Sequence, residues 1–151
     1  GNAPGNDMRF YNERVESSRN FANKVWNASR FIMMNMEGKT ITEDAVSHLE
    51  PVDKWILSKL NRLVKEVTDN MESFELGIAV QKVYDFIWDV FCDWYIEIAK
   101  IRLNGNDEGA KKTARAVLVY VMSNTLKLLH PFILLLQYCK NLKMKLFRMR
   151  L

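Results

Sequence analysis

An aromatic side chain, Phe31, stands among polar residues on the first predicted helix. The polar row consists of Asn20, Lys24, Asn27 and Phe31. At 100° per residue this row lies well round the helix from the apolar side, so Phe31 is poorly explained as a core residue. An aromatic ring outside the core can stack on a planar group, and the adjacent Arg30 can form charge-assisted or bidentate hydrogen bonds. Together they are a candidate site for holding an unpaired base.

A second candidate, Ile96, comes from the third predicted helix. It points away from that helix's apolar stripe, close to the side that carries Asp85, Asp89 and Cys92. An aliphatic group in that position could cover the face of a base. The alternative for both Phe31 and Ile96 is contact with another helix, or with parts of a longer protein.

Other kinds of reactive chemistry find little support. The two histidines and two cysteines have no recognised ligand spacing, so we expect no metal site. There is no Gly-rich phosphate loop and no evident acid–base pair. Asp85, Asp89 and Asp93 form an acidic row, which we interpret as a solvated face or as partners for nearby cations. No secretion signal precedes the helices, which favours reduced cysteines and a cytoplasmic location.

The bulk composition is that of one soluble globular unit. The chain has 151 residues, of which 48% are hydrophobic and 26% charged. Its net charge is +4, but the five basic residues after Pro131 are opposed by no acid, which leaves −1 for residues 1–130. Any affinity for RNA must therefore rest on local placement of charge. The apolar run 117–136 contains charged and polar residues and a proline, which favours a buried helix over a membrane span.

Helical periodicity and helix-ending residues predict an all-α bundle of four helices. The first should be capped by Asn6 or Asp7 and end at Gly38, and Pro51 fits the first turn of the second. The predicted spans are 7–36, 51–71, 77–103 and 108–129. His130-Pro131 should then break or kink the last helix.

The third predicted helix is so broadly apolar that we expect it to be central in the bundle. Its predicted buried stripe consists of Ala79, Val83, Phe86, Ile87, Val90, Trp94, Ile98 and Ile101. Four aromatic residues, Tyr84, Trp88, Phe91 and Tyr95, widen this face.

Two stretches, RNFANKVWNASRF at 19–31 and DFIWDVFCDWYIEIAK at 85–100, resemble the anticodon-binding domain of the valyl-tRNA synthetases, which are class I aminoacyl-tRNA synthetases. The resemblance covers residues 1–132 and implies a helical bundle of that type, with the anticodon stem-loop of tRNA(Val) as partner. It implies that Arg30, Phe31 and Ile96 lie against the middle and third anticodon bases. Weaker candidates for phosphate, sugar or base-edge contacts are Lys24, Asn27, Lys100 and Arg102.

The resemblance also implies that catalysis takes place elsewhere. The HIGH-type and KMSKS-type motifs of this enzyme class are missing, so we expect no amino-acid activation by this chain alone. ATP would be a co-substrate of the parent enzyme, and this part is expected to bind no cofactor. Its expected partners are the tRNA and the catalytic and C-terminal domains of the parent, with no membrane or DNA.

Three segments are predicted: a linker at 1–6 that follows the catalytic domain, the bundle at 7–132, and an atypical basic tail at 133–151. The family's wording holds through Phe132 and then stops, which indicates either a frameshift or cloning change, or a divergent ending.

Two alternatives to the valyl interpretation stay open. The equivalent domain of an isoleucyl or leucyl enzyme is disfavoured by the wording around Cys92 and Trp94. A helical protein-interaction module would instead use Phe31 and Ile96 to dock onto another protein.

Overall fold

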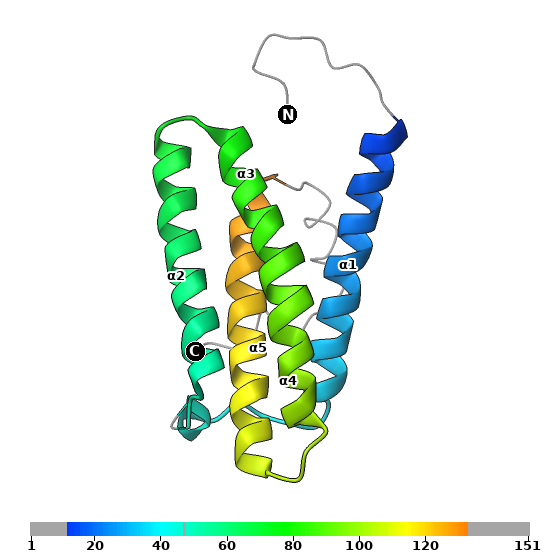
Figure 1. Cartoon of the computed structure of the whole chain (residues 1–151), viewed down its shortest axis with the longest axis vertical. Helices are drawn as coiled ribbons and strands as arrows, with labels where there is room; N and C mark the ends of the chain where they lie inside the picture. Colours follow the sequence, from blue (N-terminus) through cyan, green and yellow to red (C-terminus); the bar gives the residue numbers. More distant parts are fainter. Residues whose placement is uncertain (1–11, 47, 133–151) are drawn as a thin grey trace.

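The computed structural model describes residues 12–46 and 48–132. Four helical rods run along one long axis (Figure 1). They are α1 (Asn12–Met36), α2 (Pro51–Glu72), a third rod made of α3 (Leu76–Asp85), η2 (Phe86–Tyr95) and α4 (Ile96–Leu103), and α5 (Glu108–Leu129). Two short 3-10 turns, η1 (Glu43–Val46) and η3 (His130–Phe132), complete the order. Every regular element in the described ranges is helical, which confirms the all-α bundle.

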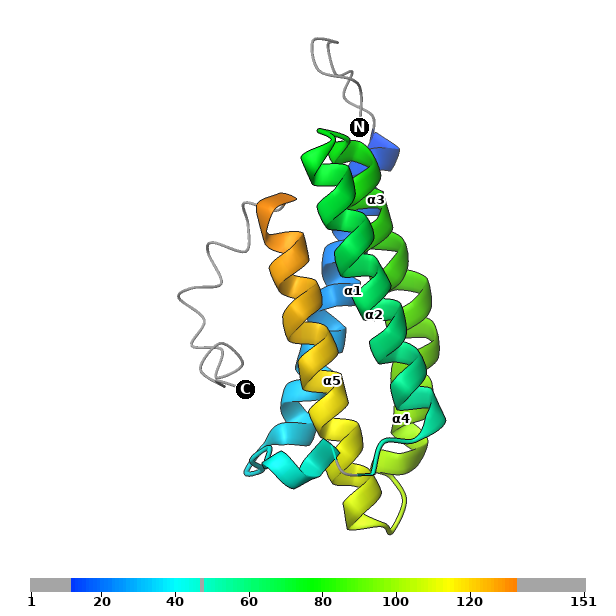
Figure 2. The same ribbon diagram turned by 90° about the vertical axis from the view of Figure 1, so that its left-hand side faces the viewer.

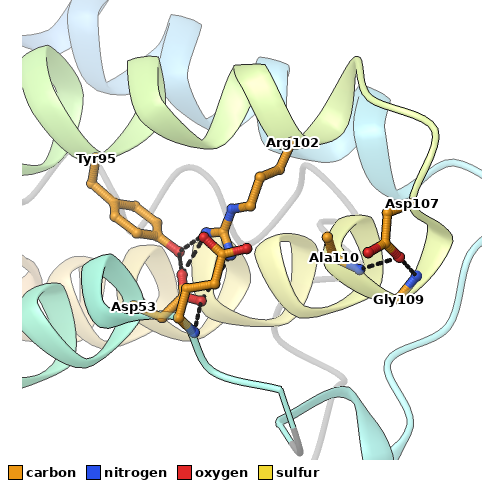
Figure 3. Close-up of polar contacts among 7 residues, drawn as sticks. Asp53, Tyr95, Arg102, Asp107, Gly109 and Ala110 are labelled. Atoms are coloured by element: carbon orange, nitrogen blue, oxygen red, sulfur yellow. Dashed lines mark hydrogen bonds and ion pairs between the residues drawn. The ribbon is translucent and has the colours of Figure 1, made fainter.

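The predicted helix ends are confirmed where the structure describes them. Gly38 follows α1 with φ +67°, a conformation that glycine adopts at little steric cost. Pro51 occupies the first turn of α2. The side chain of Asp107 caps α5 by accepting from the N–H groups of Gly109 (2.8 Å) and Ala110 (3.1 Å) (Figure 3). The proposed caps Asn6 and Asp7 lie outside the described residues.

The third rod and α5 each contact both α1 and α2, so these two rods form the middle of the bundle. Their buried side chains, together with one stripe from each outer helix, make a single core. The stripe from α2 consists of Ile56, Leu60, Leu63 and Val67, with half-buried Met71 at its end. The stripe from α1 consists of Phe21, Val25, Ala28 and Ile32. The central position predicted for the third helix is confirmed.

The predicted buried stripe of the third rod is right in its first half and wrong in its second, although Phe91 and Tyr95, which were predicted to widen that face, are fully buried. Ala79 and Val83 are buried as expected, whereas Trp94 is 64% exposed and Ile101 is 75% exposed. One buried row of this rod recurs at every fourth position: Ala79, Val83, Ile87, Phe91, Tyr95, Ala99 and Leu103. Phe86, Cys92 and Ile96 are buried beside it.

The π-helical segment η2 explains the difference. In a straight α-helix, positions four residues apart drift by about 40° per turn, so these seven residues could not all face one side. A π turn closes its hydrogen bond at i→i+5 and therefore holds more residues than an α turn. Ten residues of η2 adopt this wider winding. It offsets the drift and turns the inner face away from Trp94 and toward Tyr95.

Two substitutions test this register. Phe91→Ala should lower the free energy of unfolding by about 3–5 kcal/mol, because Phe91 is fully buried and its loss leaves a cavity. Trp94→Ala should change it by no more than about 0.5 kcal/mol, because the indole is largely in solvent. Urea unfolding of both variants measures the two values. A large loss of stability in Trp94→Ala and a small one in Phe91→Ala would instead support the register of a straight α-helix.

Candidate functional site

Phe31 and Lys100 meet where α1 packs beside the third rod. Both lie near the C-terminal ends of their helices, at the same end of the bundle (Figure 1). The Nζ atom of Lys100 is 5.6 Å from the centroid of the Phe31 ring, within the range of a cation–π contact. Phe31 is half-buried and packs against the core, so the expectation that it lies clear of the core is wrong.

Two exposed polar side chains flank this contact. Asn27 lies one helical turn before Phe31, and Arg30 precedes it directly. Arg30 forms no ion pair with any residue that the structure describes. We call the set Asn27, Arg30, Phe31 and Lys100 the α1–α4 surface. It combines one aromatic ring, one amide and two cations.

The cation of Lys100 is available to a ligand despite its partner on the same helix. Its Nζ lies 2.6 Å from Oε1 of Glu97, and the two side chains are 40% and 57% exposed. Such a solvated pair contributes at most about 1 kcal/mol. A phosphate oxygen could therefore take the place of Glu97.

Ile96 is buried, with 5% of its surface exposed, so its expected exposure is wrong. The cause is the winding of η2, which ends at Tyr95 and leaves Ile96 turned inward. A straight α-helix would have placed it on the outer side. Its assignment as a base contact stays a prediction, with only an edge of the side chain within reach of a ligand.

Lys24, a weaker candidate, is held by η2. Its Nζ is 2.7 Å from Oδ1 of Asp93 and 3.8 Å from the centroid of the Trp88 ring. These two contacts tie α1 to the π-helical segment. They also confirm that a member of the acidic row pairs with a neighbouring cation, while Asp85 and Asp89 are exposed as predicted.

Arg102, the other basic candidate on the third rod, points inward to Asp53 on α2 (Figure 3). Its Nη1 donates to Oδ2 of Asp53 at 2.8 Å and its Nη2 to Oδ1 at 2.5 Å. Tyr95 donates its hydroxyl to the same Oδ1 at 2.7 Å, and the N–H of Glu50 donates to Oδ2 at 2.9 Å. Arg102 is thus used inside the protein and is not exposed for RNA.

The electrostatics of this network follow from its geometry. Burial by itself raises the pKa of Asp53, but the hydrogen bonds from Arg102, Tyr95 and the Glu50 backbone, with the charge of Arg102, bring it below its ordinary value. Burial and the hydrogen bond to Asp53 raise the pKa of Tyr95. The hydrogen bond to Asp53 raises the pKa of Arg102 against the effect of its burial. The carboxylate, the neutral phenol and the guanidinium are therefore the stable forms at neutral pH.

Sequence reasoning missed this network. A local signal existed, because Asp53 stands three residues after Glu50 and closes a capping box at the start of α2. The bonds to Tyr95 and Arg102 join residues 42 and 49 positions apart. Helical periodicity carries no information about such pairings.

Other chemical groups add no reaction centre to the described part. Burial raises the pKa of the Cys92 thiol to about 11, so it is protonated and a poor nucleophile. Among residues 12–46 and 48–132, no three His, Cys, Asp or Glu side chains are grouped so as to hold a metal ion. No helix in these ranges has the length and apolarity needed to cross a membrane. Cys139 lies outside the described residues.

Comparison with known proteins decides the family. The family model described as the anticodon-binding domain of tRNA ligase matches residues 53–133. This chain belongs to that family. It is also similar to the valine--tRNA ligases of Clostridium tetani (60% identical over 133 residues), Clostridium acetobutylicum (58% over 134) and Bacillus cereus (54% over 133). Each match covers 87% of this chain and 15% of the relative, so the chain spans about 15% of the length of these curated relatives.

The two comparisons cover different parts of the site. The anticodon-binding domain model begins at residue 53, so it includes Lys100 and the side chains of Asp53, Tyr95 and Arg102 but not α1. A match to 87% of the chain necessarily includes Phe31 and Arg30 as well. The α1–α4 surface thus lies wholly within the region shared with the valine--tRNA ligases.

Replacing Asp53 should damage the anticodon-binding domain more than replacing any exposed acid. Asp53→Ala should lower the free energy of unfolding by about 3–5 kcal/mol, because it leaves the buried guanidinium of Arg102 without its main partner. Chemical unfolding at pH 7 measures the change. Asp89→Ala, at an exposed position, is the matched control and should have almost no effect.

The same network predicts how stability depends on pH. Because the pKa of Asp53 is lower in the folded chain, its contribution is fully present above its unfolded pKa, near 3.8, and is lost as the pH falls through the folded value. The difference in unfolding free energy between the unsubstituted chain and Asp53→Asn should therefore shrink at acid pH. A difference that stays constant from pH 7 to pH 2 would contradict this assignment.

Proposed function

We propose that this chain binds the anticodon stem-loop of tRNA(Val), as the anticodon-binding part of a valine--tRNA ligase that acts in the cytoplasm. The observation that carries the proposal is the 60% identity to a valine--tRNA ligase, in a region that contains the whole α1–α4 surface. Aminoacylation with ATP is assigned to the rest of such a ligase, most of whose length lies outside this match.

The α1–α4 surface offers the contacts that single-stranded RNA requires. Bases that leave the anticodon loop stack are held by aromatic platforms and read along their exposed edges. We assign Phe31 as the platform, a contact of about 1–3 kcal/mol per base. Arg30 and Asn27 are assigned to base edges or sugars, and Lys100 to a phosphate that positions the RNA without reading its sequence.

The remaining predicted contacts enter the proposal in supporting roles. Ile96 is assigned as apolar backing, with only its exposed edge open to a base. Lys24 holds α1 against η2, and Arg102 holds α4 against α2. The isoleucyl and leucyl alternatives are less favoured, because the relatives described above are valine--tRNA ligases.

A tRNA titration tests the proposal. Transfer RNAs with one common body and either valine or non-valine anticodons are titrated into the 151-residue chain at several salt concentrations. Base reading predicts a preference for valine anticodons that survives rising salt. Attraction by the basic residues at 140–150 would fade steeply with salt and ignore the anticodon. Equal affinity for all anticodons at every salt concentration would contradict the proposal.

A single substitution tests the stacking platform. Phe31→Ala should weaken binding of the valine anticodon by roughly five- to 150-fold, the equivalent of about 1–3 kcal/mol. Tyr120→Ala removes an exposed aromatic ring from α5, a helix that contributes no residue to the α1–α4 surface, and serves as the matched control. Thermal unfolding of both variants separates binding from packing. Unchanged affinity in Phe31→Ala would remove Phe31 from the site.

A further inference from the structure

The turn between α2 and α3 holds a phenylalanine where helices usually place glycine. The N–H of Glu75 donates to the carbonyl of Asn70 at 2.8 Å, and the N–H of Phe74 donates to the carbonyl of Met71 at 3.1 Å. These two bonds define a Schellman motif in which Phe74 occupies the left-handed position, with φ 58°. An L residue with a side chain is strained in that conformation, and glycine is not.

Burial of the side chain does not offset this backbone strain. The Phe74 side chain is 89% exposed, so the strained backbone presents a ring to solvent and not to the core. Leu76 and Ile78 follow it and are 52% and 48% exposed. We call these three residues the turn patch. Strained residues tend to be kept where function needs them, and an exposed apolar cluster commonly marks an interface.

The position of the turn patch indicates what covers it. The α2–α3 turn lies at the same end of the bundle as the start of α1 and the end of α5 (Figures 1 and 2). A chain that continues beyond the bundle in either direction therefore leaves from this end. The relatives are several times longer than the matched region, so each carries most of its mass outside it.

The charges around the patch favour protein over RNA. Asp69, Glu72 and Glu75 are exposed beside it. From residue 67 to residue 81 the chain contains no lysine or arginine. This acidic segment by itself would repel a phosphate backbone. A protein surface with an apolar hollow and basic residues around it would be complementary.

We propose that the turn patch is the surface through which this bundle docks onto the remainder of its own tRNA ligase chain. Phe74 is the anchor, and the left-handed backbone holds its ring out toward that partner. The inference rests on the chain being part of a longer ligase and is independent of which anticodon is read.

Hydrogen exchange tests the docking surface without RNA. A hybrid is made in which only the matching part of this chain replaces the corresponding 133-residue segment of the Clostridium tetani valine--tRNA ligase. Backbone amides of residues 76–80 should exchange roughly tenfold more slowly, or slower still, in the hybrid than in the 151-residue chain alone. Phe74→Gly and Phe74→Asn, both of which suit the left-handed backbone, should each abolish that difference. Val64→Ala, an exposed apolar residue on α2, should leave it intact.

The same variants exclude a merely structural role for Phe74. In the isolated chain, Phe74→Gly should leave the thermal midpoint unchanged or raise it, because it relieves backbone strain. A lowered midpoint, or equal exchange in hybrid and isolated chain, would overturn the proposal. The proposal would also be overturned if protection of the isolated chain rose with its concentration, which would indicate a second copy. Protection that appeared only when tRNA was added would overturn it as well. Failure of the anticodon titration would leave this result unaffected.

Discussion

The carboxylate of Asp53 is the constraint on which the arrangement of the bundle depends. It is completely buried, and it accepts hydrogen bonds from its own helix start, from Tyr95 and from two nitrogens of Arg102. A buried charge without such partners would cost several kcal/mol. The start of α2 and the second half of the third rod are therefore held in the relative position that brings these three side chains together (Figure 3).

This constraint explains why the third rod contains a π-helical segment. Ala79 and Val83 must face the core near the α2–α3 turn, and Tyr95 must face Asp53 further along the same rod. Tyr95 comes sixteen positions after Ala79. In an ordinary α-helix this is nearly four and a half turns, which would put the two residues on opposite sides. They face the same side only if each turn holds about four residues. The wider winding of η2 reconciles these two demands. It also sets the direction of Lys100, which follows buried Ala99 and lies over Phe31.

The features that could be predicted from the sequence are those that depend on residues close together in the chain. Helix ends depend on residues next to one another, so Gly38, Pro51 and the break at His130 were placed correctly. The faces of α1 and α2 followed the 3.6-residue period closely. The second half of the third rod did not, because the change of winding has no local mark that periodicity can detect. Ile96 was therefore placed on the wrong side.

The same limit applies to the candidate site: residues on one helix could be predicted, but contacts between helices could not. Phe31 and Arg30 stand out on one helix alone, and the structure brings Lys100 to Phe31 from another. Arg102 differs from Lys100 by only two positions, yet one points inward to Asp53 and the other outward. Composition cannot separate two such cations. Only the pairing with a carboxylate 49 residues away does so.

The third rod also relates the two ends of the molecule. It runs from Leu76 in the turn patch to Lys100 on the α1–α4 surface, so these two surfaces lie near opposite ends of the rod. Arg30, Phe31 and Lys100 lie at one end and the acidic, apolar turn at the other, so the two proposed partners would be kept apart. Because the Asp53 network fixes the rod near the end that carries Lys100, a shift of the rod at that end would have to break buried charge contacts. The bundle is therefore better suited to hold the two partners at a constant separation than to bend between them.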